Sequence, residues 1–445
     1  MIRFLQISDI HFTDKSGNDD EYAQMKRKFL EDLAACRQDF GVIDYVLICG
    51  DIAFSGLETQ YRKARKFIDD IIEKTKCDKN NVLMVPGNHD KKWDVYSRTR
   101  WLLRDQLIKT KNTRQLLESK VKEPLAVGIL YAPFKQYYKL AADYLSISGL
   151  ALKASAFPES DQKIEDIPKF EPDDSMYWTE KLGELKGYQI AIHGSNSSLL
   201  SDKDDGESWT ITREENKNKH LQVLPLQAYN VTAGSEEIHI LMLHHPMSEI
   251  NDEKIIGPDI DNRFKLQFYG HVHKQSSSCD GVIKIYSGAL QPPEEENNKE
   301  YFPIYNVIEV DVVDEGGDPK LKVNVFCRKW DGSKFDEYTE ETKVGKNALK
   351  VNLPKNDAWK KTMESIARGE SFMEETEKTK EIRLSHATKH AFLESENKGR
   401  IIKELYGTIF DSVSPNRIKY ITFLNQVEKD GKIIELNEIL KKYGK

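Results

Sequence analysis

Short apolar runs alternate with longer amphipathic segments over the first part of the chain. The apolar runs predict strands at Arg3–Ile7, Tyr45–Cys49 and Val82–Val85, and the segments between them predict helices over residues 21–40 and 58–75. Alternation of this kind is typical of parallel βαβ units, in which the helices cover the sheet. The first part of the chain therefore predicts an α/β fold.

From residue 188 onward the pattern changes to successive strands with few helical segments. The expected strands are Gln189–Ile192, Ile238–Leu243, Lys265–Tyr269, Val282–Tyr286, Tyr305–Val313 and Lys322–Cys327. We expect this second half of the chain to form the other sheet of a layered sandwich.

Four parts of the chain are expected to have different roles. Residues 1–335 predict the α/β core, and residues 91–187 predict a cap inserted into it. The strands are expected to stop after residue 332, so residues 336–354 are interpreted as a linker. Apolar positions then recur at helical spacing, which predicts a C-terminal helical module over residues 355–445.

Composition indicates a large globular protein. The chain has 445 residues, of which 39% are hydrophobic and 31% charged, and no apolar run reaches the length that spans a bilayer. Its start passes directly into the first strand without a signal peptide, which predicts a cytoplasmic location and no membrane partner. Five scattered cysteines without a Cys-x-x-Cys pair exclude a zinc finger as the expected metal site.

Side chains that bind metals gather directly after five of the apolar runs. They are Asp9 and His11, Asp51, Asn88 with His89, His244, and His271 with His273. With His245, which follows His244 directly, six of the eleven histidines lie in these blocks, a concentration that packing alone does not explain. A carboxylate with two oxygens is suited to bridging two cations, and Asp51 fits that part because Gly50 lets the chain bend steeply before it.

The mixture of ligands indicates the kind of metal. Imidazole, carboxylate and amide groups together suit manganese, iron or zinc better than calcium or magnesium, which prefer oxygen ligands alone. We expect two divalent metal ions, with manganese as the first choice and iron, zinc or a mixed pair as alternatives. A pair of this kind supplies concentrated positive charge and an ionised water for phosphate ester hydrolysis.

The five blocks resemble the calcineurin-like metallophosphoesterase superfamily, whose motifs are Asp-x-His, Gly-Asp, Gly-Asn-His-Asp or Glu, His, and Gly-His-x-His. The matching blocks are Asp9-Ile10-His11, Gly50-Asp51, Gly87-Asn88-His89-Asp90, His244-His245 and Gly270-His271-Val272-His273. The resemblance covers roughly residues 1–330 and implies a four-layer α/β/β/α sandwich. Within this superfamily, the chain is similar to bacterial cyclic-nucleotide phosphodiesterases and to the nuclease subunit of repair complexes.

The resemblance also implies roles for the individual residues. One metal would be held by Asp9, His11, Asp51 and His273, and the other by Asp51, Asn88, His244 and His271. The catalytic residues would be His89, which faces the leaving group, and Asp90, which orients its ring. His245 is the alternative to His244, because the register could differ by one residue.

Two further segments are candidates for substrate binding. Residues 91–139 contain twelve lysines and arginines against four acidic residues, with aromatic side chains interleaved. Cations bind phosphates and aromatic rings stack on bases, which makes Arg98, Arg100 and Arg104 candidates for contact with nucleic acid or nucleotides. The alternative is a helical cap with aromatic residues in its core. Asn196, in a polar loop after an expected strand, is a fourth candidate.

Together these patterns predict a two-metal-dependent phosphodiesterase acting on nucleic acid or nucleotides. One alternative is a phosphomonoesterase acting on a phosphoprotein or small metabolite. Another is a regulatory or assembly subunit acting through its C-terminal helices. Residues 346–445 carry twenty lysines and arginines against fifteen acidic residues, which favours docking onto the acidic remainder of the chain or binding to a partner protein. Direct contact with nucleic acid is the alternative.

Overall fold

The computed structural model describes most of the chain. The described residues are 1–15, 22–95, 99, 102, 124–145, 177–201, 234–250, 253–291, 302–338, 348–367, 398–406, 423, 427 and 432–443. They belong to two compact units. The first unit is Met1–Ala142 with Ile147–Thr362, and the second is Asp143–Ser146 with Met363–Lys445.

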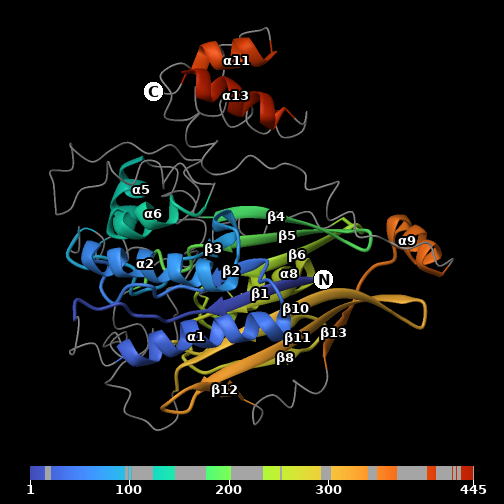
Figure 1. Ribbon diagram of the computed structural model, residues 1–445, viewed down its shortest axis with the longest axis horizontal. Helices are drawn as coiled ribbons and strands as arrows, with labels where there is room; N and C mark the ends of the chain where they lie inside the picture. The colour runs from blue at the N-terminus through green and yellow to red at the C-terminus, as the bar shows by residue number, and fades with distance from the viewer. Residues whose placement is uncertain are drawn as a thin grey trace. The chain divides into compact units, whose positions relative to one another are not determined.

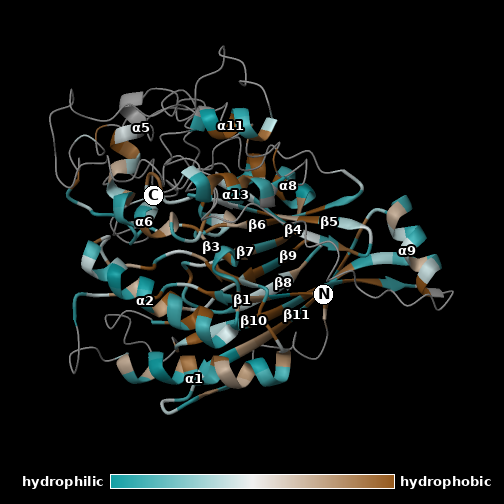
Figure 2. Ribbon diagram, turned by 45° about the horizontal axis from the view of Figure 1, so that its top comes forward, coloured by the Kyte–Doolittle hydropathy of each residue, from teal (hydrophilic) through white to brown (hydrophobic). Residues whose placement is uncertain are grey.

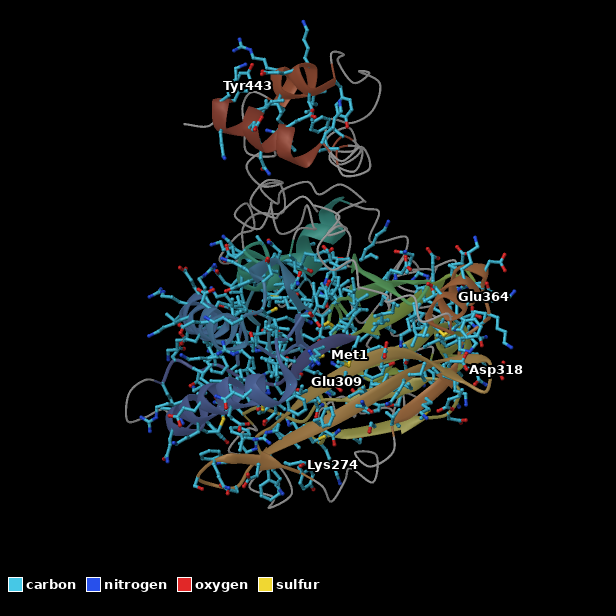
Figure 3. The ribbon with its side chains drawn as sticks, turned by 45° about the vertical axis from the view of Figure 1, so that its right-hand side comes forward. Met1, Lys274, Glu309, Asp318, Glu364 and Tyr443 are labelled. Atoms are coloured by element: carbon cyan, nitrogen blue, oxygen red, sulfur yellow. The ribbon has the colours of Figure 1, made fainter. Side chains whose placement is uncertain are left out.

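One sheet of the first unit combines strands from both ends of that unit (Figure 1). Its order is β12-β11-β10-β1-β2-β3, and β13 pairs with β11. The strands are β1 (Ile2–Ile7), β2 (Tyr45–Ile48), β3 (Val82–Met84), β10 (Ile304–Glu315), β11 (Asp318–Trp330), β12 (Phe335–Glu337) and β13 (Leu349–Asn352). β1, β2 and β3 run parallel, whereas β1 and β10 are antiparallel. Figure 3 shows the labelled residues Met1 and Glu309 close together where β1 and β10 pair.

The other sheet has the order β4-β5-β6-β7-β9-β8. Its strands are β4 (Tyr177–Leu185), β5 (Tyr188–Ser195), β6 (Glu237–Met242), β7 (Phe264–Tyr269), β8 (Ser276–Cys279) and β9 (Ile283–Tyr286). β5, β6, β7 and β9 are parallel, so their carboxyl ends lie at the same edge. The two sheets face each other, since the rings of Phe4 and Phe268 lie 5.7 Å apart.

Helices cover the outer faces of both sheets. On the first sheet, Phe29 of α1 (Ala23–Phe40) packs edge-on against Tyr305, with ring centroids 4.9 Å apart, and α2 (Glu58–Thr75) lies beside α1. On the second sheet, α8 (Glu253–Arg263) buries Ile256 and Ile260 in a cluster with strand residues of β6 and β7. Hydrophilic and hydrophobic stretches alternate along α1 in Figure 2, as a helix with one buried face requires. The predicted α/β fold with two sheets and flanking helices is confirmed.

The assignment of strands to sheets differs from the sequence prediction in one respect. β10 and β11 were expected in the second sheet, but both belong to the first, where β10 pairs with β1 from Ile2 to Gln6. Strands also continue after residue 332: β12 and β13 pair with β11, so the expected linker 336–354 contains part of the sheet. Hydrophobic alternation along a strand shows that one face is buried, but it does not identify the neighbouring strand.

The inserted segment 91–187 is helical between residues 124 and 141, whereas its last part, from Tyr177, forms strand β4 of the second sheet. It contains α5 (Pro124–Tyr131), the short 3-10 turn η3 (Ala132–Phe134) and α6 (Lys135–Ala141). The aromatic side chains of Tyr131, Phe134, Tyr137 and Tyr138 are all buried. The Tyr137 hydroxyl donates to the carbonyl of Met84, 3.0 Å away. These four rings are therefore part of a core, as in the helical-cap alternative, and they do not present faces to a nucleic acid.

The remaining described helices lie near the C-terminus. In the first unit, the Asn356 side chain accepts from the amide of Trp359 at the start of α9 (Asp357–Ala367). In the second unit, α11 (Lys398–Tyr406) and α13 (Ile433–Tyr443) bury one apolar cluster. The rest of the predicted helical module, residues 368–397, 407–422, 424–426, 428–431 and 444–445, lies outside the described residues. Among the described helices, none combines the length and apolar character that a membrane crossing needs.

Candidate metal centre

Each of the five predicted blocks lies at the carboxyl end of a parallel strand. Asp9, Asp51 and Asn88 follow β1, β2 and β3, while His244 and His271 follow β6 and β7. The two sheets bring these ends together, because the amide of His271 donates to the Asp9 carboxylate at 3.1 Å. Ligands in open α/β sheets bind at this edge.

The side chains form four overlapping groups, and the potential ligand atoms in each group lie within 4.8 Å of one another. The groups are Asp9 with His11 and His273, His11 with Asp51 and His89, Asp9 with Asp51 and His244, and His244 with His245 and His271. Asp51 connects the groups, since its Oδ2 lies 3.3 Å from His244 Nε2 and 3.9 Å from His11 Nε2. The Asn88 amide oxygen is 3.1 Å from His244 Nε2.

The backbone of the site is strained at the candidate ligands. Asp9, His11, Asp51, His271 and His273 all have φ between 47° and 67°, in the left-handed region that side chains other than glycine rarely adopt. Such a conformation costs on the order of 1–3 kcal/mol per residue and is typical of functional sites. The fold holds it with hydrogen bonds between loops, for example from the amides of Ile10 and His11 to the Asp51 carbonyl.

Glycines let the loops approach one another. A Cβ atom on Gly87 would lie 2.0 Å from the Asp51 carboxylate oxygen and 2.5 Å from the Asp51 backbone nitrogen. Gly50 has φ +97°, and a Cβ atom there would lie 2.4 Å from His244 Nδ1. Glycine is therefore required at these two positions, because the loops that carry the candidate ligands approach each other too closely for a Cβ atom.

Several buried polar atoms of the centre have no hydrogen-bond partner. They include Asp9 Oδ1 and both ring nitrogens of His11. The side chain of Asp9 is fully buried and that of His11 is 3% exposed, so these atoms are also shielded from water. Unpaired buried polar groups are costly, and metal coordination would satisfy them. The nitrogen and oxygen donors present fit a pair of cations such as manganese, iron or zinc.

The buried charges of the centre favour an ionised Asp51 and a protonated His244. Burial alone would raise the pKa of Asp51, but the neighbouring His244 and His89 lower it well below its usual value. Burial opposes the charge on His244 as well, yet the negative charge of Asp51 raises its pKa to about 9. Burial and the nearby His89 lower the pKa of His11 to about 3. Because a metal binds only the neutral imidazole, a cation must displace the proton of His244.

Metal binding is therefore expected to depend on pH. Protonation of His244 stabilises the metal-free fold fully below its ordinary pKa of 6.5, and this stabilisation is lost as the pH rises through about 9. Between pH 7 and pH 9 the affinity for manganese should rise by up to about tenfold per pH unit, as one proton is released. Calorimetric titration in buffers of different ionisation enthalpy measures this proton directly. An affinity that stays constant over this range, without proton release, would contradict the charge assignment.

Asp90 does not contact the His89 ring as expected. Its carboxylate accepts from the backbone amides of Ile52, Ala53 and Gly87 and from the Tyr61 hydroxyl, which lies 2.6 Å away. The His89 ring donates from Nδ1 to the Phe54 carbonyl, at 2.9 Å. The prediction that Asp90 orients His89 is wrong, because both oxygens of Asp90 are used to hold the loop that carries Asp51. Burial, together with the charge of Asp51, raises the pKa of Asp90 to about 6.

The geometry favours His244 over His245 as the residue facing Asp51. His244 Nδ1 donates to the Cys49 carbonyl at 2.7 Å, which leaves Nε2 directed toward Asp51. His245 Nδ1 lies 2.9 Å from the Ser197 hydroxyl, and its Nε2 is buried without a hydrogen-bond partner.

Asn196 has a structural position in place of the expected substrate contact. Its side chain is buried, its oxygen accepts from the Ser198 amide at 2.9 Å, and its nitrogen donates to the Tyr138 hydroxyl at 3.3 Å. The other three candidates for substrate binding, Arg98, Arg100 and Arg104, lie outside the described residues. Lys91, which contributed to the basic excess, is fully buried and donates to the carbonyls of Leu199 and Ser201.

Sequence reasoning missed one charged residue at the centre. Glu249 ends the 3-10 turn η8 (Met247–Glu249), and its Oε2 lies 3.1 Å from His271 Nε2. It does not follow a strand directly, which is the signal that located the other residues. A carboxylate five positions after His244 carries no local pattern that sets it apart from a surface glutamate.

Comparison with known proteins agrees with the fold and the motifs. The family model for calcineurin-like phosphoesterases matches residues 2–275, and the chain belongs to this family. It is 26% identical over 363 residues to the uncharacterized metallophosphoesterase-like protein YydB of Bacillus subtilis (strain 168). That alignment covers 79% of this chain and 65% of YydB, so the chain spans less than two thirds of that relative's length.

Two solved structures also match with low sequence identity. A single mutant of Vps29 from Entamoeba histolytica is 11% identical, with a TM-score of 0.30, over 79% of this chain and 99% of that one. The NAD nucleotidase NadN of Haemophilus influenzae is 12% identical, with a TM-score of 0.32, over 82% of this chain and 59% of that one.

Proposed function

We propose that the chain is a two-metal-dependent phosphodiesterase that acts on nucleic acid or nucleotides. The observation that carries this proposal is the position of Asp51, whose carboxylate lies between His11 and His244 and belongs to two of the ligand groups. One cation is assigned to Asp9, His11, Asp51 and His273, and the other to Asp51, Asn88, His244 and His271. When bound, such a pair supplies positive charge for the phosphate and lowers the pKa of water.

The residues around the pair would position the substrate for attack. The His89 amide donates to Asp51 Oδ1 at 2.8 Å, which fixes His89 beside the bridging carboxylate. Since the Phe54 carbonyl can only accept, Nδ1 of His89 carries the hydrogen of that bond. Nε2 is then the nitrogen that can accept or donate a proton. We assign to it the transfer of a proton to the leaving oxygen of the ester.

The surroundings of His89 support a substrate with a planar base. Phe54 is an exposed aromatic side chain, 43% accessible, and its ring centroid lies 5.4 Å from that of His89. Trp93 meets His89 edge-on at 6.2 Å. Two aromatic rings beside the proposed proton donor suit the base of a nucleoside leaving group, because stacking on a ring does not depend on base identity.

Removing the exposed ring is expected to affect substrates selectively. Phe54→Ala should lower kcat/KM for a dinucleotide by about tenfold or more, since stacking contributes about 1–3 kcal/mol per base. The comparison substrate is the methyl ester of the nucleoside monophosphate found in that dinucleotide. Its leaving group is methanol, which carries no base, so its hydrolysis should stay unchanged. Steady-state kinetics with manganese measure both values for each protein.

Phe302→Ala is the matched control, because Phe302 is a similarly exposed phenylalanine, 41% accessible, in contact with Lys329 and not with His89. It should leave both substrates unaffected. If Phe54→Ala slows the two substrates equally, the ring supports the site as a whole and does not bind a base.

A substrate panel tests the proposed function as a whole. The purified chain, loaded with manganese, is incubated with single-stranded DNA, duplex DNA, RNA, cyclic nucleotides and an aryl phosphate monoester. The proposal expects cleavage of at least one nucleotide diester, with weaker hydrolysis of the monoester. Hydrolysis of the monoester alone would favour the phosphomonoesterase alternative. Absence of any hydrolysis would favour a regulatory or assembly subunit, for which partner binding through the C-terminal helices stays a prediction.

A further inference from the structure

The carboxylate of Glu249 contacts a ring nitrogen of His271, one of the candidate metal ligands. Its Oε2 lies 3.1 Å from His271 Nε2, and the two side chains are only 27% and 17% exposed. The His271 backbone is also fixed, because its amide donates to the Asp9 carboxylate. The ring of His271 is therefore tied down on one side by Glu249, and Nδ1 is the nitrogen left to bind a cation.

The position of Glu249 is set by a well-anchored turn. In η8 the Glu249 amide donates to the Pro246 carbonyl at 2.9 Å, and the Ile250 amide donates to the Met247 carbonyl at 3.1 Å. Met247, the first residue of the turn, and Ile250, which follows the turn, are buried in the cluster with α8. The contact of Glu249 with His271 therefore comes from an anchored turn and does not depend on a loose surface loop.

We propose that Glu249 is a positioning residue that tunes the metal site of His271. A carboxylate only accepts hydrogen bonds, so this contact places the proton of His271 on Nε2 and would leave the lone pair of Nδ1 to hold a cation. The negative charge also makes the imidazole a stronger donor. This inference rests on the proposed function, since it assumes that His271 binds one of the two metals.

Manganese titration of the metal-free protein tests the role of Glu249 without measuring activity. Free Mn²⁺ is quantified by electron paramagnetic resonance for the full chain and for Glu249→Ala and Glu249→Gln. Loss of a partner of this kind typically weakens metal binding by about 10–100-fold. Glu249→Ala should therefore raise one of the two dissociation constants by about this factor and leave the other unchanged.

Glu249→Gln separates positioning from direct ligation. Its amide oxygen still accepts from Nε2, so this variant should recover part of the affinity lost in Glu249→Ala. Equal weakening in the two variants would overturn the positioning role, as would an unchanged affinity in Glu249→Ala. The control is Glu253→Ala, a glutamate in the first turn of α8, which should bind both ions as the unmodified chain does.

The same titration separates this inference from the function on which it rests. If the unmodified chain binds fewer than two ions, the two-metal assignment itself fails. If it binds two ions and Glu249→Ala does the same with equal affinity, only the role of Glu249 is overturned. Thermal melting of the metal-free variants shows whether they fold like the unmodified chain.

Discussion

Asp51→Asn is expected to abolish hydrolysis of phosphodiesters and to prevent the binding of a cation pair. The substitution removes the charge of the carboxylate that lies between His11 and His244, whose Nε2 atoms are 3.9 Å and 3.3 Å from Asp51 Oδ2. Losing a single preorganised charge-stabilising group commonly costs about 10²–10³ in kcat, and here both of the proposed cations would lose a shared ligand. We therefore expect a loss of at least about a thousandfold, measured by manganese-dependent hydrolysis.

Asp70→Asn is the matched control for this substitution, because Asp70 lies on α2 away from the five ligand blocks. It should retain full activity. Circular dichroism should give the same spectrum for both variants. An Asp51→Asn protein that hydrolyses phosphodiesters at the unmodified rate would overturn the assignment of Asp51 as the shared ligand.

Gly87→Ala is expected to have the next largest effect, although Gly87 binds no metal. The added Cβ atom would lie 2.0 Å from the Asp51 carboxylate and 2.5 Å from the Asp51 backbone nitrogen. Rotating the Asp51 side chain relieves only the first contact, so the two loops must separate. Overpacking of this kind costs about 1–3 kcal/mol, and it displaces the shared ligand. We expect activity to fall by about a hundredfold or more, with a lower melting temperature.

Gly257→Ala provides the comparison for Gly87→Ala. Gly257 lies within α8, where a Cβ atom would meet only the Glu253 side chain at 3.8 Å, an ordinary contact. This substitution should leave activity unchanged and change the melting temperature little, because the helix preference of alanine is opposed by Pro258, which disfavours a Cβ atom on the residue before it. If Gly87→Ala behaved like Gly257→Ala in both assays, the close approach of the two loops would not be needed for the site.

The ligand blocks could be located from the sequence because each follows a recognisable apolar strand. Parallel strands place their carboxyl ends at one edge, so the end of β1, at Asp9, and the end of β2, at Asp51, come together without any knowledge of side-chain geometry. The sheet partners of β10 and β11 could not be located in this way. Their alternating pattern is satisfied by burial against either sheet.

The finer structure of the site depends on side-chain directions, which no local pattern encodes. Asp90 follows His89 directly, yet its carboxylate turns away to the backbone of Ile52 and Ala53. Lys91 is charged, but it is buried because carbonyl oxygens from a distant loop surround it. The role of Glu249 likewise depends on a 3.1 Å contact with a residue on another strand end. Contacts between segments far apart in the chain require the folded structure.

Anomalous diffraction from crystals of the full chain grown with manganese tests the central claim most directly. If the two-metal assignment is right, the map will show two strong anomalous peaks about 3.5–4 Å apart, with the Asp51 carboxylate in contact with both. A single peak, or peaks that lie away from Asp51, would contradict it.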